Sequence, residues 1–290
     1  MAIELKVTSE TGKLKSVVIG YPHNFHKSSP EIINEKQKRY YSNNEKPTIE
    51  SLVPEFGEFK FQLKANGVAV YEPNPVEKVP DQLTPRDIGF VVGDTFVVAG
   101  MAKQSRKNEW NGIRYLIEKM SQSKVIYVPE GIVLEGGDVI VDKGCIYIGL
   151  SQRSAMKGVE FMKQKFPDYE VIPIYLKNLE SGEDVLHLDC AFMPLGISGG
   201  LIYSNGFIHV PDSIKKNYDV IELTKEEQEE LVSNVLSVSP ETVISRNHPK
   251  ASRINEIMES RGMHVVKIKF DEAPKTGGSF HCCSLPLYRE

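Results

Sequence analysis

Cys282, near the C-terminus, is the residue best suited to nucleophilic chemistry. It follows Gly277 and Gly278, and two glycines let the backbone come close to a bound molecule because no Cβ stands in the way. Such a pair means little alone, but three upstream motifs could supply partners for the thiol: Pro85-Arg86-Asp87, Glu135-Gly136-Gly137-Asp138 and His187-Leu188-Asp189. Together they offer a nucleophile, a base and a group of carboxylates, a combination that indicates an active site for a cationic substrate.

The carboxylates of these motifs favour an organic cation as their ligand. Carboxylates that face one another repel unless a cation neutralises them. The spacing does not indicate a metal site, because His187 and Asp189 would bring a single imidazole and the cysteines form no CxxC pair. A planar guanidinium has five N–H donors in a fixed fork, which suits two carboxylates that bind it bidentately.

A thiolate beside such a cation is chemically sensible. The positive charge would lower the pKa of Cys282, and the thiolate would add to the guanidinium carbon. His187 could protonate the departing amine and then deprotonate water, with Glu135 orienting the imidazole. His281 is a less suitable base, because neighbours in a strand face opposite sides. For the same reason we expect Cys283 to be a small buried residue.

The motifs lie at matching places in a repeated pattern of strand, turn and strand. Hairpins are predicted at 88–98, 138–148, 192–203 and 235–245, and the end segments 17–20 and 283–287 could pair as a fifth unit. Segments of helical period, each leading into another strand, are predicted at 103–120, 151–166 and 248–261.

This repeat predicts a closed ring. Its period is about 50 residues, and five copies make an α/β fold, a five-bladed αβ propeller of ββαβ repeats. The alternative is an ordinary α/β protein in which the alternation of strands and helices is no repeat. In a closed ring, matching positions converge on the axis, so residues far apart in sequence would line one central pocket.

Composition indicates an ordinary globular protein. A chain of 290 residues with 40% apolar and 26% charged residues can bury a sizeable core, and no linker divides it, so we expect one domain over 1–290. The net charge of −4, without a basic run, argues against nucleic acid. The N-terminus lacks the apolar stretch of a signal peptide and no segment is long enough to cross a bilayer, which predicts a cytoplasmic protein away from membranes.

One region shows no clear period. Residues 27–54 are polar, and they favour a surface excursion or a lid over the active site, with disorder as the alternative.

The phased motifs resemble the guanidino-group-modifying superfamily with the pentein fold. Its members include arginine deiminases, dimethylarginine dimethylaminohydrolases, arginine dihydrolases and glycine amidinotransferases. The resemblance runs from about Lys15 to the C-terminus and rests on Arg86-Asp87, Glu135–Asp138, His187–Asp189 and Gly277–Cys282. It implies a five-fold αβ propeller with the site on its axis, a small guanidino substrate and no cofactor.

The resemblance also implies roles for single residues. Cys282 matches the family nucleophile, His187 its acid/base and Glu135 the acidic partner of that histidine. Asp87 and Asp189 match the pair that holds the guanidinium.

Three further residues complete the implied site. Asp138 matches a supporting carboxylate, and Arg153 is similar to an arginine that receives the substrate α-carboxylate in several hydrolases, with Arg106 as the second candidate for that task. The chain has no arginine directly before Cys282, and none in Ser204-Asn205-Gly206, where transferases tend to have one. The first departure implies that carboxylate recognition differs from that of arginine deiminases, and the second argues against transferase activity.

The sequence thus predicts a cysteine-dependent hydrolase of arginine, a methylated arginine or a relative. An amidinotransferase, which would pass the amidino group to an amine, is the first alternative, and a non-catalytic binding protein on the same fold is the second. The exact guanidino compound and the number of subunits stay open, and a homo-oligomer is compatible with the sequence.

Overall fold

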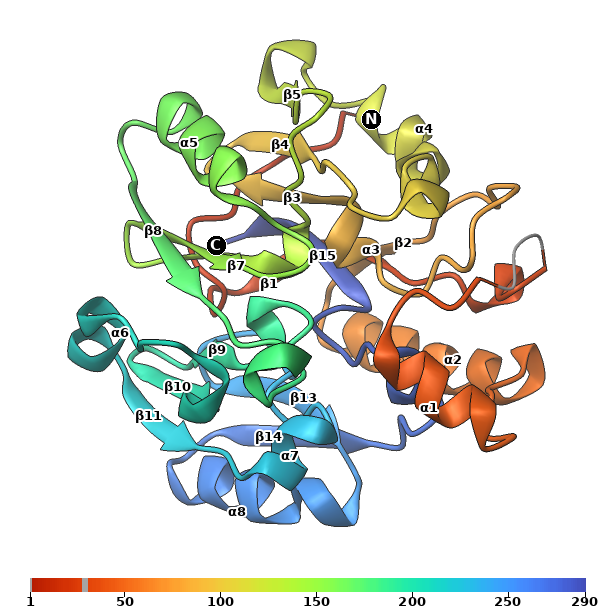
Figure 1. Cartoon of the computed structure of the whole chain (residues 1–290), viewed down its shortest axis with the longest axis vertical. Helices are drawn as coiled ribbons and strands as arrows, with labels where there is room; N and C mark the ends of the chain where they lie inside the picture. Colours follow the sequence, from red (N-terminus) through yellow and green to blue (C-terminus); the bar gives the residue numbers. More distant parts are fainter. Residues whose placement is uncertain (1, 28–30) are drawn as a thin grey trace.

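The strands form five three-stranded sheets arranged around a centre. The computed structural model describes residues 2–27 and 31–290, and the colours of Figure 1 pass once round the molecule. In every sheet of this described part, the middle strand pairs antiparallel with one neighbour and parallel with the other. The predicted ββαβ repeats and the five-bladed αβ architecture are confirmed.

The strand nearest the centre comes from the same position of each repeat. In the order inner, middle and outer, the sheets are β15 (Ser284–Arg289), β1 (Leu14–Ile19) and β2 (Ala69–Tyr71); β3 (Gly89–Val92), β4 (Thr95–Val98) and β5 (Val125–Tyr127); β6 (Val139–Asp142), β7 (Cys145–Leu150) and β8 (Glu170–Tyr175); β9 (Phe192–Leu195), β10 (Gly199–Ile202) and β11 (Asp219–Glu222); β12 (Leu236–Ser237), β13 (Thr242–Arg246) and β14 (His264–Ile268). Every residue of β3, β6, β9 and β12 is buried, whereas the outer strands are partly exposed.

Helices connect each middle strand to its parallel outer neighbour and cover the periphery. The connecting helices are α2 (Ile49–Ala65), α4 (Arg114–Ile117), α5 (Met156–Lys165), α6 (Asp212–Asn217) and α8 (Ser252–Ser260), and the remaining ones are α1 (Glu35–Ser42), α3 (Pro85–Ile88) and α7 (Lys225–Glu229). In the described residues no helix is long and apolar enough to cross a membrane.

The segment 103–120 differs from the predicted helix. It forms 3₁₀ turns at Gln104–Arg106 and Glu109–Ile113 before the single turn of α4. Its path bends because Arg106 turns inward to buried carboxylates. In addition, Gly112 packs so closely that a Cβ there would lie 2.5 Å from the Gln82 side chain.

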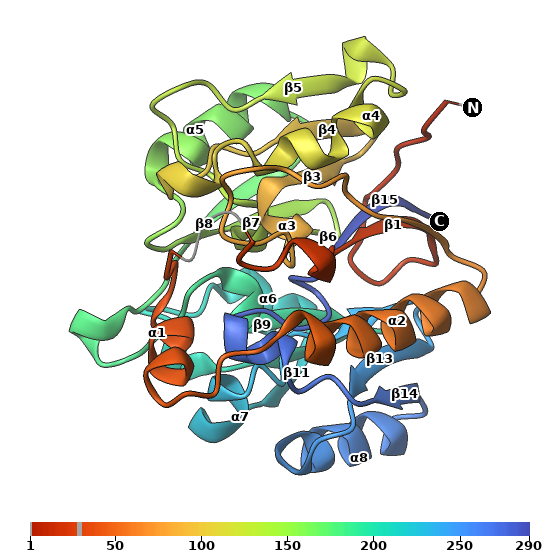
Figure 2. The same cartoon turned by 90° about the vertical axis from the view of Figure 1, so that its right-hand side faces the viewer.

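Residues 35–42 and 49–54 of the polar region 27–54 are helical. The region shows no clear period because α1 is made up largely of charged and polar residues, but the N-terminus of α1 is capped by Asn34, whose side chain accepts from Gln37 N at 2.8 Å. The Thr48–Ser51 capping box begins α2. Figures 1 and 2 show α1 and α2 on the same side of the molecule. Residues 28–30 of this predicted lid lie outside the described residues.

The two ends of the chain close the ring. β1 pairs antiparallel with β15, from Leu14 opposite Arg289 to Ile19 opposite Ser284. Lys13 and Glu290 exchange two backbone hydrogen bonds of 2.9 Å. The predicted pairing of the end segments is therefore confirmed.

Short turns precede the inner strands and contact one another around the centre. The five turns are α3, the 3₁₀ turns Gly136–Asp138 and Leu188–Cys190, and the segments 233–235 and 279–283. The first and second meet where Gly136 packs on Arg86, since a Cβ at Gly136 would lie 2.1 Å from the Arg86 carbonyl oxygen. Asp138 Oδ1 accepts from Leu188 N (3.0 Å), which joins the second turn to the third. Arg86 N donates to the Cys282 carbonyl (3.2 Å) and joins the fifth turn to the first.

Candidate active site

His187 is buried between two carboxylates. Its Nε2 lies 2.9 Å from Glu135 Oε2, and its Nδ1 lies 3.7 Å from Asp87 Oδ1. Burial by itself lowers the pKa of His187, but the charges of Asp87, Asp138 and Glu135 outweigh it and raise the pKa to about 10. The imidazole is therefore protonated at neutral pH, the form in which it can donate a proton as a general acid.

Asp87 stands between a protein cation and the pocket. Its Oδ2 accepts from Arg106 Nη1 at 2.8 Å, whereas its buried Oδ1 accepts no hydrogen bond from the described residues. Burial tends to raise the pKa of Asp87, but the charges of His187 and Arg106 lower it below its usual range. The carboxylate is thus ionised, and one oxygen is available to a ligand.

Both candidate carboxylate receptors bind protein carboxylates in this structure. Arg106 forms a bidentate ion pair with Glu109, in which Nε donates to Oε2 (2.7 Å) and Nη2 donates to Oε1 (3.1 Å), and it also binds Asp87. Arg153 lies 3.2 Å from Glu135 Oε2 and donates to the Ile33 carbonyl. The prediction that either arginine receives a substrate carboxylate stays untested, and binding of one would have to compete with these ion pairs.

Asp138 supports the backbone near His187. Besides accepting from Leu188 N, it accepts from Ser151 Oγ through Oδ2 at 2.6 Å. Burial raises the pKa of Asp138 to about 7. Asp138 thus binds the turn that follows the histidine, and its supporting role stays a prediction.

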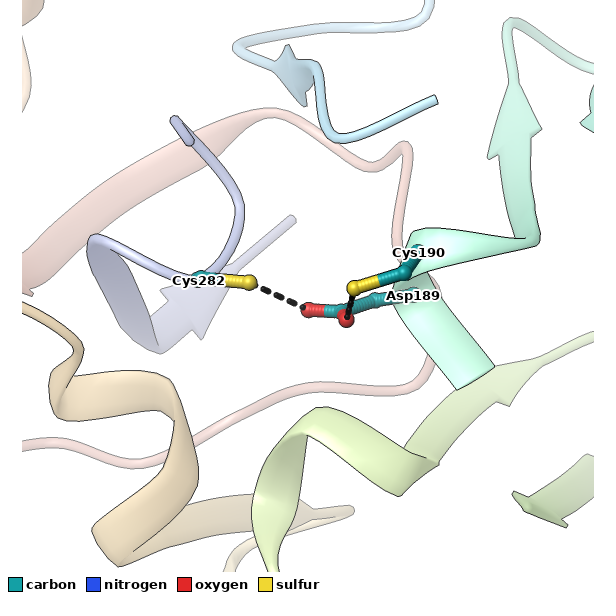
Figure 3. A group of neighbouring side chains, drawn as sticks. All are labelled: Asp189, Cys190 and Cys282. Atoms are coloured by element: carbon teal, nitrogen blue, oxygen red, sulfur yellow. Dashed lines mark hydrogen bonds between the residues drawn. The ribbon is translucent and has the colours of Figure 1, made fainter. Parts of the chain in front are cut away.

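Cys282 is held between two polar side chains. Its thiol donates to Asp189 Oδ2 (3.2 Å), and its sulfur accepts from Asn234 Nδ2 (3.1 Å). In Figure 3 the Cys190 and Cys282 thiols face each other from opposite sides of the Asp189 carboxylate, whose Oδ1 accepts from Cys190 at 3.5 Å. The Cys190 thiol, burial and the Asp189 charge raise the pKa of Cys282 well above its usual range. Without a cation nearby, Cys282 is a thiol.

His281 lies closer to the site than strand alternation predicted. Residues 279–283 form a turn rather than a strand, so His281 and Cys282 both contact Asp189 Oδ2, at 2.8 and 3.2 Å. The other imidazole nitrogen lies 3.3 Å from Glu10 Oε2. His281 thus orients Asp189, whereas Cys283 packs in an apolar cluster with Phe280 and is buried, as predicted.

Five of the predicted residues line one narrow pocket, whereas Glu135, Asp138 and Asp189 contact the site from outside its lining. The pocket is lined by Ile33, Asn34, Gln37, Asp81, Thr84, Asp87, Arg106, Arg153, Leu186, His187, Thr276, Gly277 and Cys282. A wider cleft of about 300 Å³ adjoins it and shares Asn34, Leu186 and Gly277 with it. The start of α1 therefore covers the narrow pocket, and the cleft lies directly next to it.

Two groups of side chains could each offer three ligand atoms to a metal ion. They are Asp189, Cys190 and Cys282, and Asp87, Glu135 and His187, with ligand atoms within 4.8 Å of one another. In the second group Glu135 binds Arg153 and Asp87 binds Arg106, so bound metal would displace existing cations.

Several residues at this site were not predicted from the sequence, and Asn234 and Glu109 are the two that bind predicted site residues most directly. Asn234 stands directly before β12, the position in the fourth repeat that matches Asp87 in the first, so the repeat itself could have pointed to it. Glu109 lies in the segment predicted as a regular helix, and no local signal showed that its side chain would bind Arg106.

The five-bladed fold and the arrangement of a buried thiol, a histidine and carboxylates around its centre match the pentein superfamily of guanidino-modifying enzymes. The family model for "N,N dimethylarginine dimethylhydrolase, eukaryotic" matches residues 22–289. The chain belongs to this family.

Relatives with and without a described activity are similar to this chain in sequence or in structure. The uncharacterized protein YkgA of Bacillus subtilis is 32% identical over 282 residues, which cover 97% of this chain and 94% of that protein. The amidinotransferase SxtG of Microseira wollei superposes with a TM-score of 0.82 at 20% identity and covers 98% of this chain and 97% of its own. The dimethylarginine dimethylaminohydrolase of Pseudomonas aeruginosa, complexed with citrulline, superposes with a TM-score of 0.77 at 19% sequence identity. The match covers 94% of this chain and 99% of that enzyme. Likeness at this identity establishes the fold alone.

Proposed function

We propose that the protein is a cysteine-dependent hydrolase of a guanidino compound, namely arginine, a methylated arginine or a relative. One observation carries the proposal: the Cys282 thiol, the His187 imidazole and the free Oδ1 of Asp87 belong to the same buried pocket. A nucleophile, an acid and an anionic receptor for a cation are the three groups that this reaction needs.

The guanidinium is held by carboxylates on two sides. Asp87 offers Oδ1, and Asp189 offers the oxygen that accepts the thiol proton of Cys282 in the free protein. Two carboxylates match the forked N–H donors of the substrate. The bound cation also removes the obstacle to thiolate formation, because its charge offsets that of Asp189 beside the sulfur. Substrate binding thus activates the nucleophile, and the thiol proton leaves to solvent.

The first half of the reaction forms a covalent adduct. The Cys282 thiolate forms a bond to the guanidinium carbon, which becomes tetrahedral and loses its charge. His187, held as imidazolium by Glu135 and Asp87, donates its proton to the leaving nitrogen, and the C–N bond breaks. An amine or ammonia departs, and an amidino group remains on the sulfur.

The second half returns the enzyme to its starting state. Neutral His187 takes a proton from water as the water oxygen bonds to the amidino carbon. The C–S bond then breaks, the ureido product forms, and the thiolate regains a proton from the collapsing hydroxyl group. The balance is one guanidino group and one water consumed, with one ureido group and one amine released.

An amidinotransferase is the alternative that the adjoining cleft favours. The cleft lies directly beside the narrow pocket and reaches Cys190 and Asp184, so an amine could approach the adduct in place of water. The two activities share the adduct and differ in what attacks it.

Mass spectrometry of the products tests the proposal. The purified protein is given arginine, dimethylarginine, agmatine and guanidinoacetate, each with and without glycine, and is also quenched in acid to trap an adduct on the Cys282 peptide. Cys282→Ser should abolish both product and adduct, and Cys283→Ser, in the apolar cluster, should change neither by more than about twofold.

Ammonia or an alkylamine together with a ureido product would support the hydrolase and name its substrate. Glycine-dependent amidino transfer would replace it with the transferase. Absence of product and of adduct with all four compounds would overturn the proposal, and so would equal losses in the two cysteine variants.

A further inference from the structure

Asn234 makes more contacts with the nucleophile than the chemistry above uses. It is 1% exposed, and it stands in the turn before β12, where the fourth repeat faces the fifth. Its Oδ1 accepts from the backbone N–H groups of Cys282 (3.0 Å) and Ser279 (3.1 Å). Its Nδ2 donates to Cys282 Sγ at 3.1 Å and to the Asp189 carbonyl at 3.4 Å.

These contacts determine the orientation of the amide. Two backbone N–H groups can be satisfied by an oxygen only, so the Oδ1 position is fixed and the NH₂ group must point at the sulfur and at the Asp189 carbonyl. The same amide therefore positions the Cys282 backbone and presents an N–H donor to its side chain.

The other groups around the sulfur disfavour a negative charge. Asp189 and Cys190 come from the third turn, Asp87 comes from α3, and His281 reaches the sulfur only through Asp189. His187, Arg106 and Arg153 line the same pocket, but each is paired with Glu135, Asp87 or Glu109. Among the described residues, Asn234 is the side chain whose N–H group donates a hydrogen bond to Cys282 Sγ, whereas the neighbouring Cys190 thiol raises the pKa of Cys282.

We propose that Asn234 is a further catalytic residue, which stabilises the Cys282 thiolate through Nδ2 and thereby assists both formation of the adduct and departure of the sulfur from it. The role rests on the proposed function of Cys282 as nucleophile. A hydrogen bond to a charged acceptor is about twice as strong as one to a neutral acceptor. The contact is therefore stronger with the thiolate than with the thiol or with the uncharged sulfur of the adduct.

The variant Asn234→Asp separates the two functions of the amide. It keeps an oxygen for the N–H groups of Cys282 and Ser279 but replaces the donor by a carboxylate oxygen. Asn255→Asp is the matched control, because Asn255 is also buried (3% exposed) and bonded through both amide atoms, to Ser245 and Arg246, away from the thiol. The readout is the rate at which iodoacetamide alkylates Cys282 between pH 6 and 10, followed on its peptide by mass spectrometry.

We expect the apparent pKa of the Cys282 thiol to rise by at least about one unit in Asn234→Asp, so that alkylation below this pKa slows at least about tenfold. The control should keep the wild-type profile. With a substrate, kcat should fall by a similar factor while KM stays within about twofold, because Asn234 does not line the substrate pocket. A folded Asn234→Asp variant with an unchanged alkylation profile would overturn the proposal.

A measurement on the wild-type protein avoids the risk that the variant does not fold. The side-chain ¹⁵N resonance of Asn234 should shift with pH in step with alkylation of Cys282, and this shift should vanish in Cys282→Ala. A resonance that ignores the thiol titration would refute the role. Because alkylation and NMR need no substrate, they judge Asn234 separately from the proposed reaction, which fails only if no guanidino compound is turned over.

Discussion

Replacing Glu135 by glutamine should lower the pKa of His187 and with it the pH range of activity. The carboxylate lies 2.9 Å from His187 Nε2, and at an effective dielectric near 20 two unit charges at this separation interact by roughly 4–6 kcal/mol. Since about 1.4 kcal/mol corresponds to one pKa unit, loss of the charge could shift the histidine by about 3–4 units at most. Asp87 and Asp138 remain, so we expect a pKa between about 6.5 and 8 in place of about 10.

Hydrogen bonding reinforces this shift. Glu135 accepts from His187, from Arg153 and from the Ala102 N–H group (2.9 Å), so it faces donors on every side. A glutamine oxygen can satisfy Ala102, but the NH₂ group then meets His187, and only a neutral imidazole nitrogen can accept from it. Glu135→Gln therefore favours the neutral histidine that the first half-reaction cannot use.

The assay is an NMR titration of ¹³C-labelled histidine, with His187 assigned by its absence in His187→Gln. Glu227→Gln is the control, because Glu227 is likewise a buried partner of an arginine, Arg253 (2.6 Å), but has no contact with the histidine. In Glu135→Gln the alkaline limb of the kcat profile should move down with the histidine. A His187 pKa that stays near 10 in this variant would refute the coupling on which the acid role depends.

Three other perturbations test further parts of the site. Asp87→Asn and Asp189→Asn, each combined with Cys282→Ser to stop turnover, should weaken guanidinium binding in calorimetry by about 10- to 100-fold, since a hydrogen bond to a charged group contributes roughly 1.5–3 kcal/mol; full affinity would exclude the residue from the receptor. The pKa of His187 is raised from 6.5 in the unfolded chain to about 10 in the folded one, so its contribution to stability is complete below about pH 6.5 and is lost as the pH rises through about 10. Tm should therefore fall over this pH window, and it should fall less in His187→Gln. Parallel curves of Tm against pH for the wild type and the variant would contradict the linkage. Gly137→Ala places a Cβ 2.7 Å from Asp87 Oδ1 and 2.8 Å from His187 Cγ, and it should reduce kcat by about 100-fold or more. The control Gly57→Ala, where no atom lies within 4 Å of the new Cβ, should retain activity and gain about 0.5–1 kcal/mol of stability. An active Gly137→Ala enzyme would show that the pocket is less tightly packed.

The fold was predictable because its signals are local. Each hairpin has its own alternation and its own turn, and the same pattern returns along the chain, so the ring follows from the repeat. The convergence of Asp87, His187 and Cys282 follows as well, since each stands before an inner strand. The residue types that the proposed chemistry needs, and their matching positions in the repeats, could therefore be read from the sequence.

The parts that escaped prediction depend on contacts between distant segments. The segment 103–120 departs from a regular helix where Arg106 reaches Asp87, and the turn at 279–283 follows from Asn234, which binds two of its N–H groups. No short-range pattern encodes such partners. Likewise α1 consists almost entirely of polar residues and tyrosines, and its position over the pocket depends on Asn34, which caps the helix and also donates to the Thr276 carbonyl.

The closure of the ring by β1 and β15 has a consequence for biosynthesis. A ribosome releases Ile19 long before Ser284, so β1 is made early and its antiparallel partner β15 is made only after the other strands of the five sheets. The nascent chain can already contain the carboxylates and the histidine, but Cys282 reaches Asp189 and Asn234 only after the final segment has docked. Long-range pairing of this kind is the slow part of folding. The reactive thiol is therefore the last group to be placed, and assembly intermediates carry an incomplete site.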